Sequence, residues 1–348
     1  MNNSRTLRVL VGAAAMVVVV GGLKAAAWLV APLMLAVALT IVFHPLRIYL
    51  ERRTPRWVAT TAVLLAAYVL ILLFLLALVI SLGQLAALVP KYAPEVNQHI
   101  DDIGSWLQDR GVASGQSQTM ASALDPQKIV GAVTSFLSNI AGALTSLFFF
   151  GMLLVFLAVD SAYVGRLIEL SRTHRPHLVD ALTSFAHGTR TYLAVSAIFG
   201  LIVAVCDTVL LWAMGVPGAF VWGVLAFVTN FIPNIGFVIG LIPPSLVALL
   251  DSGPGLMLAV IVVYSLLNLV IQSIIQPRYV GEAVGLSTSL TFLSLVFWTW
   301  ILGPLGALMA VPMSLLLKAI LVEADPDARW LDVVLSGRPD DHPSAAAP

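Results

Sequence analysis

Charged residues are scarce in this chain. Of its 348 residues, 10% are Asp, Glu, Lys or Arg, whereas 59% are hydrophobic. A soluble domain carries about 25% charged residues, so this composition, with a mean hydropathy of +0.98, argues against a soluble protein. It predicts an all-α polytopic membrane protein. The formal net charge of +0 gives no indication of a nucleic-acid partner.

Cysteine and the signatures of common chemistry are also missing. Cys206 is the single cysteine, which excludes an intrachain disulfide and a cysteine-based zinc site. No GxxxxGK[ST] occurs, so ATP does not drive this chain directly, and HExxH and GxSxG are absent too. Asp160 and Asp207 fall at opposite ends of their predicted helices, which argues against a membrane aspartyl dyad. We therefore expect no enzyme, no cofactor and no metal.

Long apolar runs are abundant instead, and a membrane-spanning helix needs roughly 20 such residues. They predict about eight membrane segments. The organisation expected is N-terminal spans in residues 1–83, an extracytoplasmic amphipathic segment in 84–128, a transport core in 129–322 and a partly disordered tail in 323–348. The first run, 7–22, also fits a signal peptide, but Lys24 and the apolar run that follows favour a retained span.

The orientation follows from Lys and Arg in the short loops. Arg5 and Arg8, the turn at residues 47–56 and the segment at residues 166–190 all fall on one side if each early span crosses once. That side is predicted to be the cytoplasm, and both chain termini are expected there.

Two apolar blocks are too long for one span and contain helix breakers. Residues 218–250 would form a rod of roughly 50 Å, against a hydrocarbon core of about 30 Å. The prolines of FVTNFIPNIGFVIGLIPP divide this block into 219–232 and 236–250, and GPLG divides residues 289–320 in the same way. Paired interruptions of this kind indicate an internal repeat and point to a transporter's binding site. The alternative to a binding site is a pair of tilted, proline-kinked helices that merely pack.

The broken blocks leave two topologies open. In one topology both blocks cross the membrane fully, which gives about eight spans. In the other, each is a re-entrant hairpin, and the two enter from opposite faces like an inverted repeat. In both cases irregular backbone survives in a membrane only where protein or a wet cavity satisfies it, so the breaks are expected to face a polar cavity or another helix.

Polar and small residues within the apolar core are the candidates for a substrate path. Tyr264, Asn268, Gln272 and Gln276 recur every four residues on one face. The alternative role for such residues is interhelical hydrogen bonding without transport. The predicted path comprises Asn230, Pro233, Asn234, Gly236, Asn268, Gln272, Gln276, Gly303 and Gly306.

Asp207 is the candidate for ion coupling. It lies one to two turns before the predicted external end of its span, and a carboxylate at the centre of such a helix costs about 2.5–3.5 kcal/mol to insert. One interpretation is that it faces a cavity and binds a proton or cation. The other is that it reaches interfacial water or accepts a bond from a neighbouring group such as Thr208.

Several motifs, taken together, resemble the autoinducer-2 exporter family of bacterial permeases. They are NFIPNIG at residues 230–236, IPP at 242–244, Gln276-Pro277 with the trailing Gly281, and GPLGALMAVP at 303–312. The resemblance covers most of the chain, although Phe237 replaces a frequent proline and Asn234 a frequent aromatic residue. It implies a multi-pass protein of the bacterial inner membrane that forms a homo-oligomer. Some members export the quorum-sensing furanone, and others exchange sodium for protons.

The function expected from residues and resemblance together is secondary transport. We predict a permease in the lipid bilayer that exports a small polar or amphipathic solute similar to autoinducer-2, coupled to H⁺ or Na⁺. The alternative within transport is a Na⁺(Li⁺)/H⁺ antiporter. The alternative from another class is a structural membrane scaffold without flux.

Overall fold

The computed structural model describes residues 3–84 except 74, 78 and 82, and residues 126–232, 235–276, 285–328 and 330–336. Regular structure within these ranges is helical, with no strand, which confirms the all-α prediction. Nearly all of the predicted amphipathic segment, together with Pro233, Asn234 and Gly281, lies outside the described residues.

Four described helices are long and apolar enough to cross a membrane. They are α2 (Ala27–Glu51), Arg56–Ser81, α6 (Pro176–Ala213) and Pro254–Gln272. A fifth span is present if the bent pair Phe149–Ser161 and Tyr163–Arg172 counts as one. The chain is thus a polytopic membrane protein, and the number eight stays a prediction.

The arginine-rich segment at residues 166–190 divides between two long helices. α5 runs from Pro126 to Arg172 and α6 begins at Pro176. The axis bends by 54° after Ser161. The part of α5 after this bend contains good helix formers such as Leu, Glu and Arg, and proline is favoured at the first position of a helix. The segment at residues 166–190 is therefore mostly helical.

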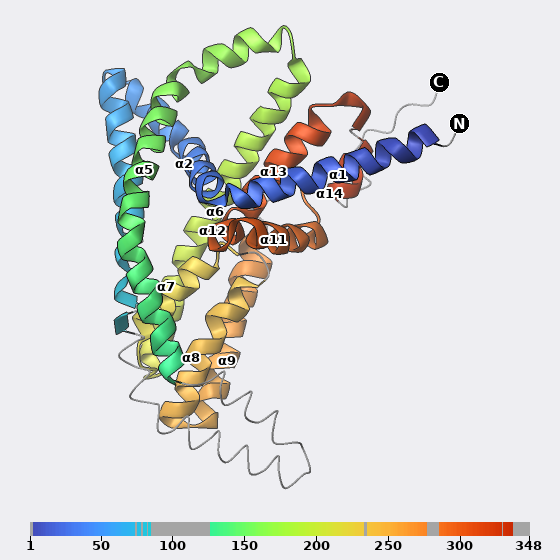
Figure 1. Ribbon diagram of the computed structural model, residues 1–348. Coiled ribbons are helices and arrows are strands. Elements are labelled where there is room, and N and C mark those ends of the chain that lie inside the picture. The colour runs from blue at the N-terminus through green and yellow to red at the C-terminus, as the bar shows by residue number, and fades with distance from the viewer. Residues whose placement is uncertain are drawn as a thin grey trace. The chain divides into compact units, whose positions relative to one another are not determined.

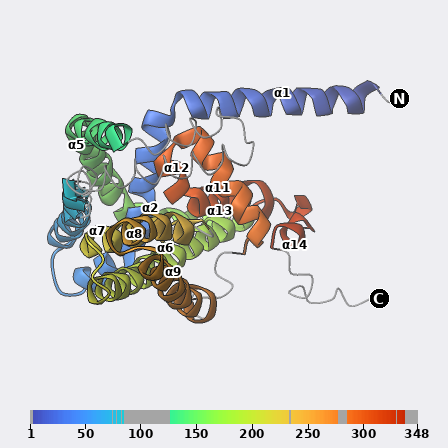
Figure 2. The ribbon, with the colours of Figure 1, turned by 90° about the horizontal axis from the view of Figure 1, so that it is seen from below.

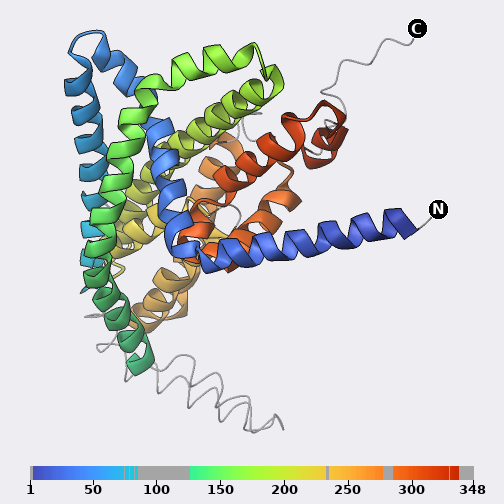
Figure 3. The same cartoon turned by 45° about the horizontal axis from the view of Figure 1, so that its top comes forward.

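The chain divides into two compact units, and the first comprises Met1–Ala67, Phe149–Ala194 and Val280–Pro348. In this unit α1 (Asn3–Ala25) packs against α2 and against α11 (Thr288–Leu302), where the Lys24 ammonium lies 3.9 Å from the centre of the Trp300 ring. The N-terminal part of α1 extends away from both helices (Figures 2 and 3). Its exposed valines, such as Val18, suit a helix that faces lipid.

The C-terminal part of the first unit is held by a buried lysine. Lys318, at the end of α13 (Ala310–Lys318), has a side chain only 9% exposed. Its Nζ pairs with Glu323 Oε1 at 3.1 Å and with Asp332 Oδ1 at 2.7 Å. Asp332 belongs to α14 (Trp330–Ser336), so these ion pairs fasten the last described helix to α13.

The second unit comprises Tyr68–Phe148 and Val195–Tyr279. Its helices α7 (Ala219–Thr229), α8 (Gly236–Ser252) and α9 (Pro254–Asn268) pack in sequence, with α8 between the other two (Figures 1 and 2). A π-helix, Leu269–Ile275, continues directly from α9. The buried core is built from all of these and from the second half of α6, with Val203, Trp222, Ala248, Val260 and Tyr264 among its members.

The first interrupted block folds back on itself. An ideal Cβ on Gly236, at the start of α8, would lie 1.8 Å from the carbonyl oxygen of Thr229, at the end of α7. One on Gly240 would lie 3.8 Å from the Cα of Ala226, whereas in a continuous rod residues 226 and 240 would be about 21 Å apart. The two helices are therefore the arms of a hairpin, and α7, with 11 residues, is far shorter than a span.

The second interrupted block folds back as well, within the first unit. After α11, Gly303 has a φ of 69° and begins a turn into α12 (Pro304–Leu308), and α13 returns against α11. The Trp298 indole Nε1 donates to Ser314 Oγ at 3.0 Å, joining the two arms. The chain geometry of both blocks thus agrees with hairpins and not with continuous kinked rods, because each returning arm packs along the arm before it.

Candidate transport site

The most unusual polar group of the second unit is the carboxylate of Asp207 on α6. The residue is 1% exposed, and neither of its oxygens has a hydrogen bond of good geometry from the described residues. The Tyr264 hydroxyl and the Asn268 side-chain amide lie beside it. Because the side chain is enclosed by protein, the interpretation in which it reaches out to water does not apply to this structure.

A row of amide side chains continues from this carboxylate. Gln272 Nε2 donates to Asn268 Oδ1 at 2.8 Å and to Asn230 Oδ1 at 3.0 Å. Asn230 Nδ2 in turn donates to the Ser196 carbonyl oxygen on α6 at 2.9 Å. These contacts join α6, the end of α7 and the π-helix after α9 into one connected polar row. We call Asp207, Tyr264, Asn268, Gln272 and Asn230 the polar row.

Local backbone features place the members of the polar row. Asn230 is the residue after α7, where the helix ends and its side chain turns towards Ser196. Gln272 lies in the middle of the π-helix, a form that occurs frequently at functional sites. The Tyr264 hydroxyl lies against Gly240, where an ideal Cβ would approach it to 2.8 Å. The small residue on α8 therefore leaves room for the hydroxyl beside Asp207.

Chemically, the polar row offers both donors and acceptors in an otherwise apolar unit. Each amide carries a carbonyl acceptor and two N–H donors, and the carboxylate supplies two further acceptors. A buried carboxylate that lacks a hydrogen bond of good geometry is costly unless a proton neutralises it or a cation pairs with it. The arrangement can therefore bind a cation or proton at one end and exchange amide hydrogen bonds with a polar solute along the rest.

The structure brings together four of the predicted candidates. Asn230, Asn268, Gln272 and Asp207 form the polar row. Gly236 follows Asn230 by six positions and is the first residue of α8, directly after the turn of the first hairpin. Gln276 is half-buried and follows the π-helix. Gly303 and Gly306 belong to the first unit, and Pro233 and Asn234 lie outside the described residues. The proposal that all of them line one path stays a prediction.

Sequence reasoning undervalued Tyr264 and overlooked Thr229. Tyr264 was noted only as one member of a polar stripe, and its position beside Asp207 has no sequence signal because 57 positions separate the two. Thr229 is buried, and its carbonyl oxygen receives the close approach of Gly236. A threonine at the end of an apolar helix does not by itself indicate such a contact.

Long apolar helices, two hairpins and a buried polar row together define a polytopic membrane protein of the transporter class. The chain belongs to the AI-2E family of transporters, whose model, described as AI-2E family transporter, matches residues 13–324. This confirms the resemblance found in the motifs.

Curated relatives match along almost the whole chain. A putative transport protein of Haemophilus influenzae is 32% identical over 333 residues, which cover 94% of this chain and 95% of the relative. The AI-2 transport protein TqsA of Escherichia coli is 29% identical over 331 residues, 95% and 96% of the two chains. The putative transport protein YhhT of the same species is 30% identical over 335 residues, 96% and 95%.

Proposed function

We propose that this protein is a secondary transporter that exports a small polar or amphipathic solute of the autoinducer-2 type along the polar row. In this proposal Asp207 binds the coupling ion, H⁺ or Na⁺. The observation that carries it is a carboxylate that is 1% exposed, has, among the polar groups of the described residues, only the Tyr264 hydroxyl and the Asn268 amide beside it, and lies at the end of a continuous row of amides. The relative named an AI-2 transport protein supports the class of solute.

The buried carboxylate favours ion coupling for an energetic reason. An ionisable residue in a membrane span is expensive, and such residues mark ion pathways and proton relays. The ion pairs of this structure lie elsewhere among the described residues, which supports a mobile cation or proton as the charge partner of Asp207 in this proposal. The Tyr264 hydroxyl supplies an oxygen atom beside this carboxylate, and the Asn268 side-chain amide also lies next to it, which suits a hard cation as well as a proton.

The amide row favours a solute with several hydrogen-bonding groups. Asn230, Gln272 and Asn268 are bonded to one another and to backbone in this structure. A solute with hydroxyl groups replaces these bonds one for one, so entry does not leave a polar group unsatisfied. The proposed path continues through Pro233, Asn234, Gly236 and Gln276 and includes Gly303 and Gly306 of the other hairpin.

The proposal includes the cellular setting that the sequence predicts. We expect a homo-oligomer in a bacterial inner membrane, with both termini in the cytoplasm and each hairpin entering the bilayer without crossing it. Partners are then the lipid bilayer, the solute and the coupling ion.

The experiment is solute flux in proteoliposomes across a range of pH. The variant Asp207→Asn removes the titrating group at nearly constant volume, and Asp251→Asn makes the same change at an exposed carboxylate at the end of α8. We expect counterflow of labelled autoinducer-2 by the native protein to vary with pH and that of Asp207→Asn to be flat, while Asp251→Asn keeps the native profile. A pH profile of Asp207→Asn identical to the native one contradicts coupling at this residue.

The same vesicles distinguish the alternatives. Oxygen atoms around a buried carboxylate also suit Na⁺, so an antiporter would move protons in response to Na⁺ or Li⁺ without any solute, and Asp207→Asn would abolish that movement. Gln272→Leu interrupts the amide row, and we expect it to reduce solute flux but not cation exchange. Absence of flux under every gradient tested would favour the scaffold.

A further inference from the structure

The turn between α2 and the helix Arg56–Ser81 has the composition of a segment that lies at the surface of a membrane. Residues 47–57 contain four arginines against one glutamate, and Arg52, Arg53 and Arg56 are exposed. Trp57 is 73% exposed, and the Arg53 guanidinium lies 5.1 Å from the centre of the Tyr49 ring. Exposed tryptophan and tyrosine gather at the level of lipid headgroups. We call Arg52, Arg53 and Arg56 the arginine turn.

A shallow cleft begins behind the arginine turn. It runs between α2, the helix Arg56–Ser81 and α5, and all of its lining residues belong to the first unit. Four of its polar lining residues, His44, Arg47, Thr60 and Ser161, lie at the end nearest the turn. Leu39 and Ala67 lie at the other end, where the hydroxyl of the fifth, Thr40, donates to the Ala36 carbonyl oxygen at 2.8 Å. From position 47 to position 39 the helix rises about 12 Å. The cleft therefore leads from a basic surface to hydrocarbon depth and becomes apolar on the way.

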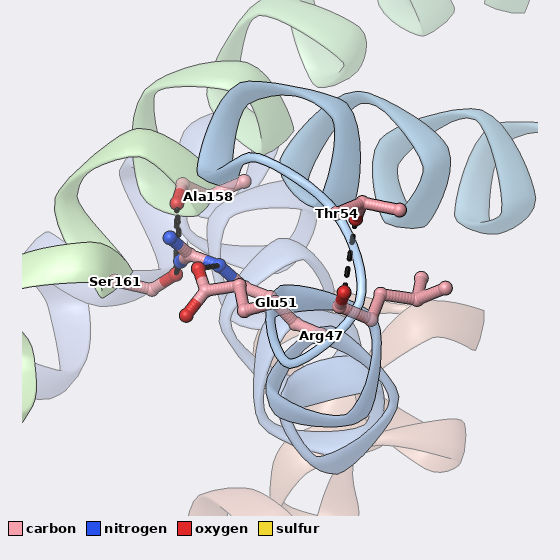
Figure 4. Close-up of polar contacts among 6 residues, drawn as sticks. Arg47, Glu51, Thr54, Ala158 and Ser161 are labelled. Atoms are coloured by element: carbon pink, nitrogen blue, oxygen red, sulfur yellow. Dashed lines mark hydrogen bonds and ion pairs between the residues drawn. The ribbon is translucent and has the colours of Figure 1, made fainter.

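The wall of the cleft is fixed by Arg47 (Figure 4). This residue is 5% exposed, and its Nε pairs with Glu51 Oε1 at 2.9 Å. Its Nη1 donates to the Ala158 carbonyl oxygen at 2.9 Å and to Ser161 Oγ, next to the bend of α5. Arg47 is thus occupied as a brace between α2 and α5. The charges that face outward are those of the arginine turn.

The cleft is too small to enclose a sugar-sized solute, but it can accommodate an alkyl chain along its open side. Only about 20 Å³ is closely enclosed, although about 360 Å³ lies along the cleft when its open side is counted. One water needs about 10–15 Å³ of enclosed space, so a sugar-sized solute has no enclosed pocket here. A flexible alkyl chain lying along the open side needs no enclosed volume, and it covers apolar residues such as Leu39 and Leu64.

We propose that this feature is a binding site for an anionic phospholipid. The phosphate headgroup binds the arginine turn, and one acyl chain lies in the cleft towards Leu39. Basic clusters at the end of a membrane helix attract anionic lipids, each arginine strengthening the attraction about fivefold. The occupant is a lipid and not a free anion because the charge and the apolar cleft are continuous. This site shares no residue with the polar row and does not depend on the transport proposal.

The test is retention of lipid by the delipidated full-length protein, measured by native mass spectrometry. Phosphatidylglycerol and phosphatidylcholine with the same acyl chains are added in turn. We expect the native protein to prefer phosphatidylglycerol, and the triple variant Arg52→Gln, Arg53→Gln, Arg56→Gln to lose up to about a hundredfold in affinity for it. The three Arg→Lys changes preserve charge and keep the preference, which separates lipid binding from misfolding.

A matched control removes the same charge elsewhere. Arg166, Arg172 and Arg175 are exposed near the turn between α5 and α6, away from the cleft lining. Changing these three to Gln is expected to leave the preference for phosphatidylglycerol intact. An equal loss in this control, or no loss in the arginine-turn variant, would overturn the proposal, because the effect would then be general surface charge or none.

The acyl chain is tested separately. Leu64→Trp places a bulky side chain on the cleft, and we expect it to weaken binding of phosphatidylglycerol several-fold with the arginine turn unchanged. Glycerol phosphate, the headgroup without its chains, is expected not to displace the lipid at equal concentration. Equal displacement by glycerol phosphate, or full binding by Leu64→Trp, would show an anion site without a chain and would overturn the assignment to a lipid.

Discussion

The hairpin of the second unit predicts a severe effect for a very small change, Gly236→Ala. The added methyl group would lie 1.8 Å from the Thr229 carbonyl oxygen and 2.7 Å from its carbonyl carbon. Ordinary contact begins at 3.4 Å, so the two arms must separate by more than 1 Å. Both colliding partners belong to the backbone, and no rotamer change relieves the clash. The turn itself has to move.

The cost follows from what that movement breaks. The Thr229 carbonyl accepts from the Ile232 N–H at 2.8 Å, and the next residue, Asn230, holds Gln272 and Ser196. Forced overpacking costs about 1–3 kcal/mol, and we expect the upper end because the backbone is displaced. A loss of about 3 kcal/mol lowers the folding equilibrium constant by roughly a hundredfold. Displacement of Asn230 also interrupts the polar row, so flux should fall.

The assay uses the single cysteine. Cys206 is half-buried on α6 in the same unit, and a maleimide dye that fluoresces on reaction reports its exposure as the detergent-purified protein is heated. Gly236→Ala should react at a clearly lower temperature than the native protein. The matched control is Gly255→Ala on α9, where an ideal Cβ meets nothing within 4 Å and the helix gains about 0.5–1 kcal/mol. Identical melting of the two variants would refute the reasoning from close approach.

Two other features of the fold allow direct tests. Lys318→Met leaves the carboxylates of Glu323 and Asp332 without their cation, and because both are partly exposed we expect a loss of about 1–2 kcal/mol. Amide hydrogen exchange in Trp330–Ser336 should accelerate in Lys318→Met, whereas Lys318→Arg should retain the native protection. Unchanged exchange in Lys318→Met would show that the lysine does not fasten α14. A re-entrant first hairpin places Ala213 and Ser252 on the same side of the membrane, so single cysteines there should react with an impermeant reagent from one side; labelling from opposite sides would mean that the block crosses.

Much of the architecture was predictable because helix breakers act locally. A proline in a helix interior removes a backbone hydrogen bond and clashes with the preceding turn, so an interruption near Pro233, between α7 and α8, was predictable. Proline does not decide this alone, because Pro243 and Pro244 stand inside α8. The four-residue spacing of Tyr264, Asn268 and Gln272 likewise places them on one face before any tertiary structure is known. Local chemistry of this kind gave the breaks, the spans and the polar stripe.

Contacts between distant positions could not be predicted. Nothing local indicates that Gln272 bonds to Asn230, 42 positions earlier. The sequence indicates for Arg47 only a role in orientation, yet the residue is buried and braces α5. Its partner, the Ala158 carbonyl oxygen, lies 111 positions further along the chain, so no local pattern indicates the contact. Lys318 had no signal at all, since its partners follow it in a tail that composition describes as polar. Long-range pairing depends on the assembled fold.

The π-helix after α9 gives this unit a way to rotate part of a helix. A π-segment carries a surplus residue relative to α-helical winding, and each residue of an α-helix accounts for about 100° of turn. If Leu269–Ile275 returned to α-helical bonding, Gln276 would swing by about that angle while Asn268 stayed in place. A change between the two windings would therefore re-aim Gln276, just beyond the polar row, without tilting α9.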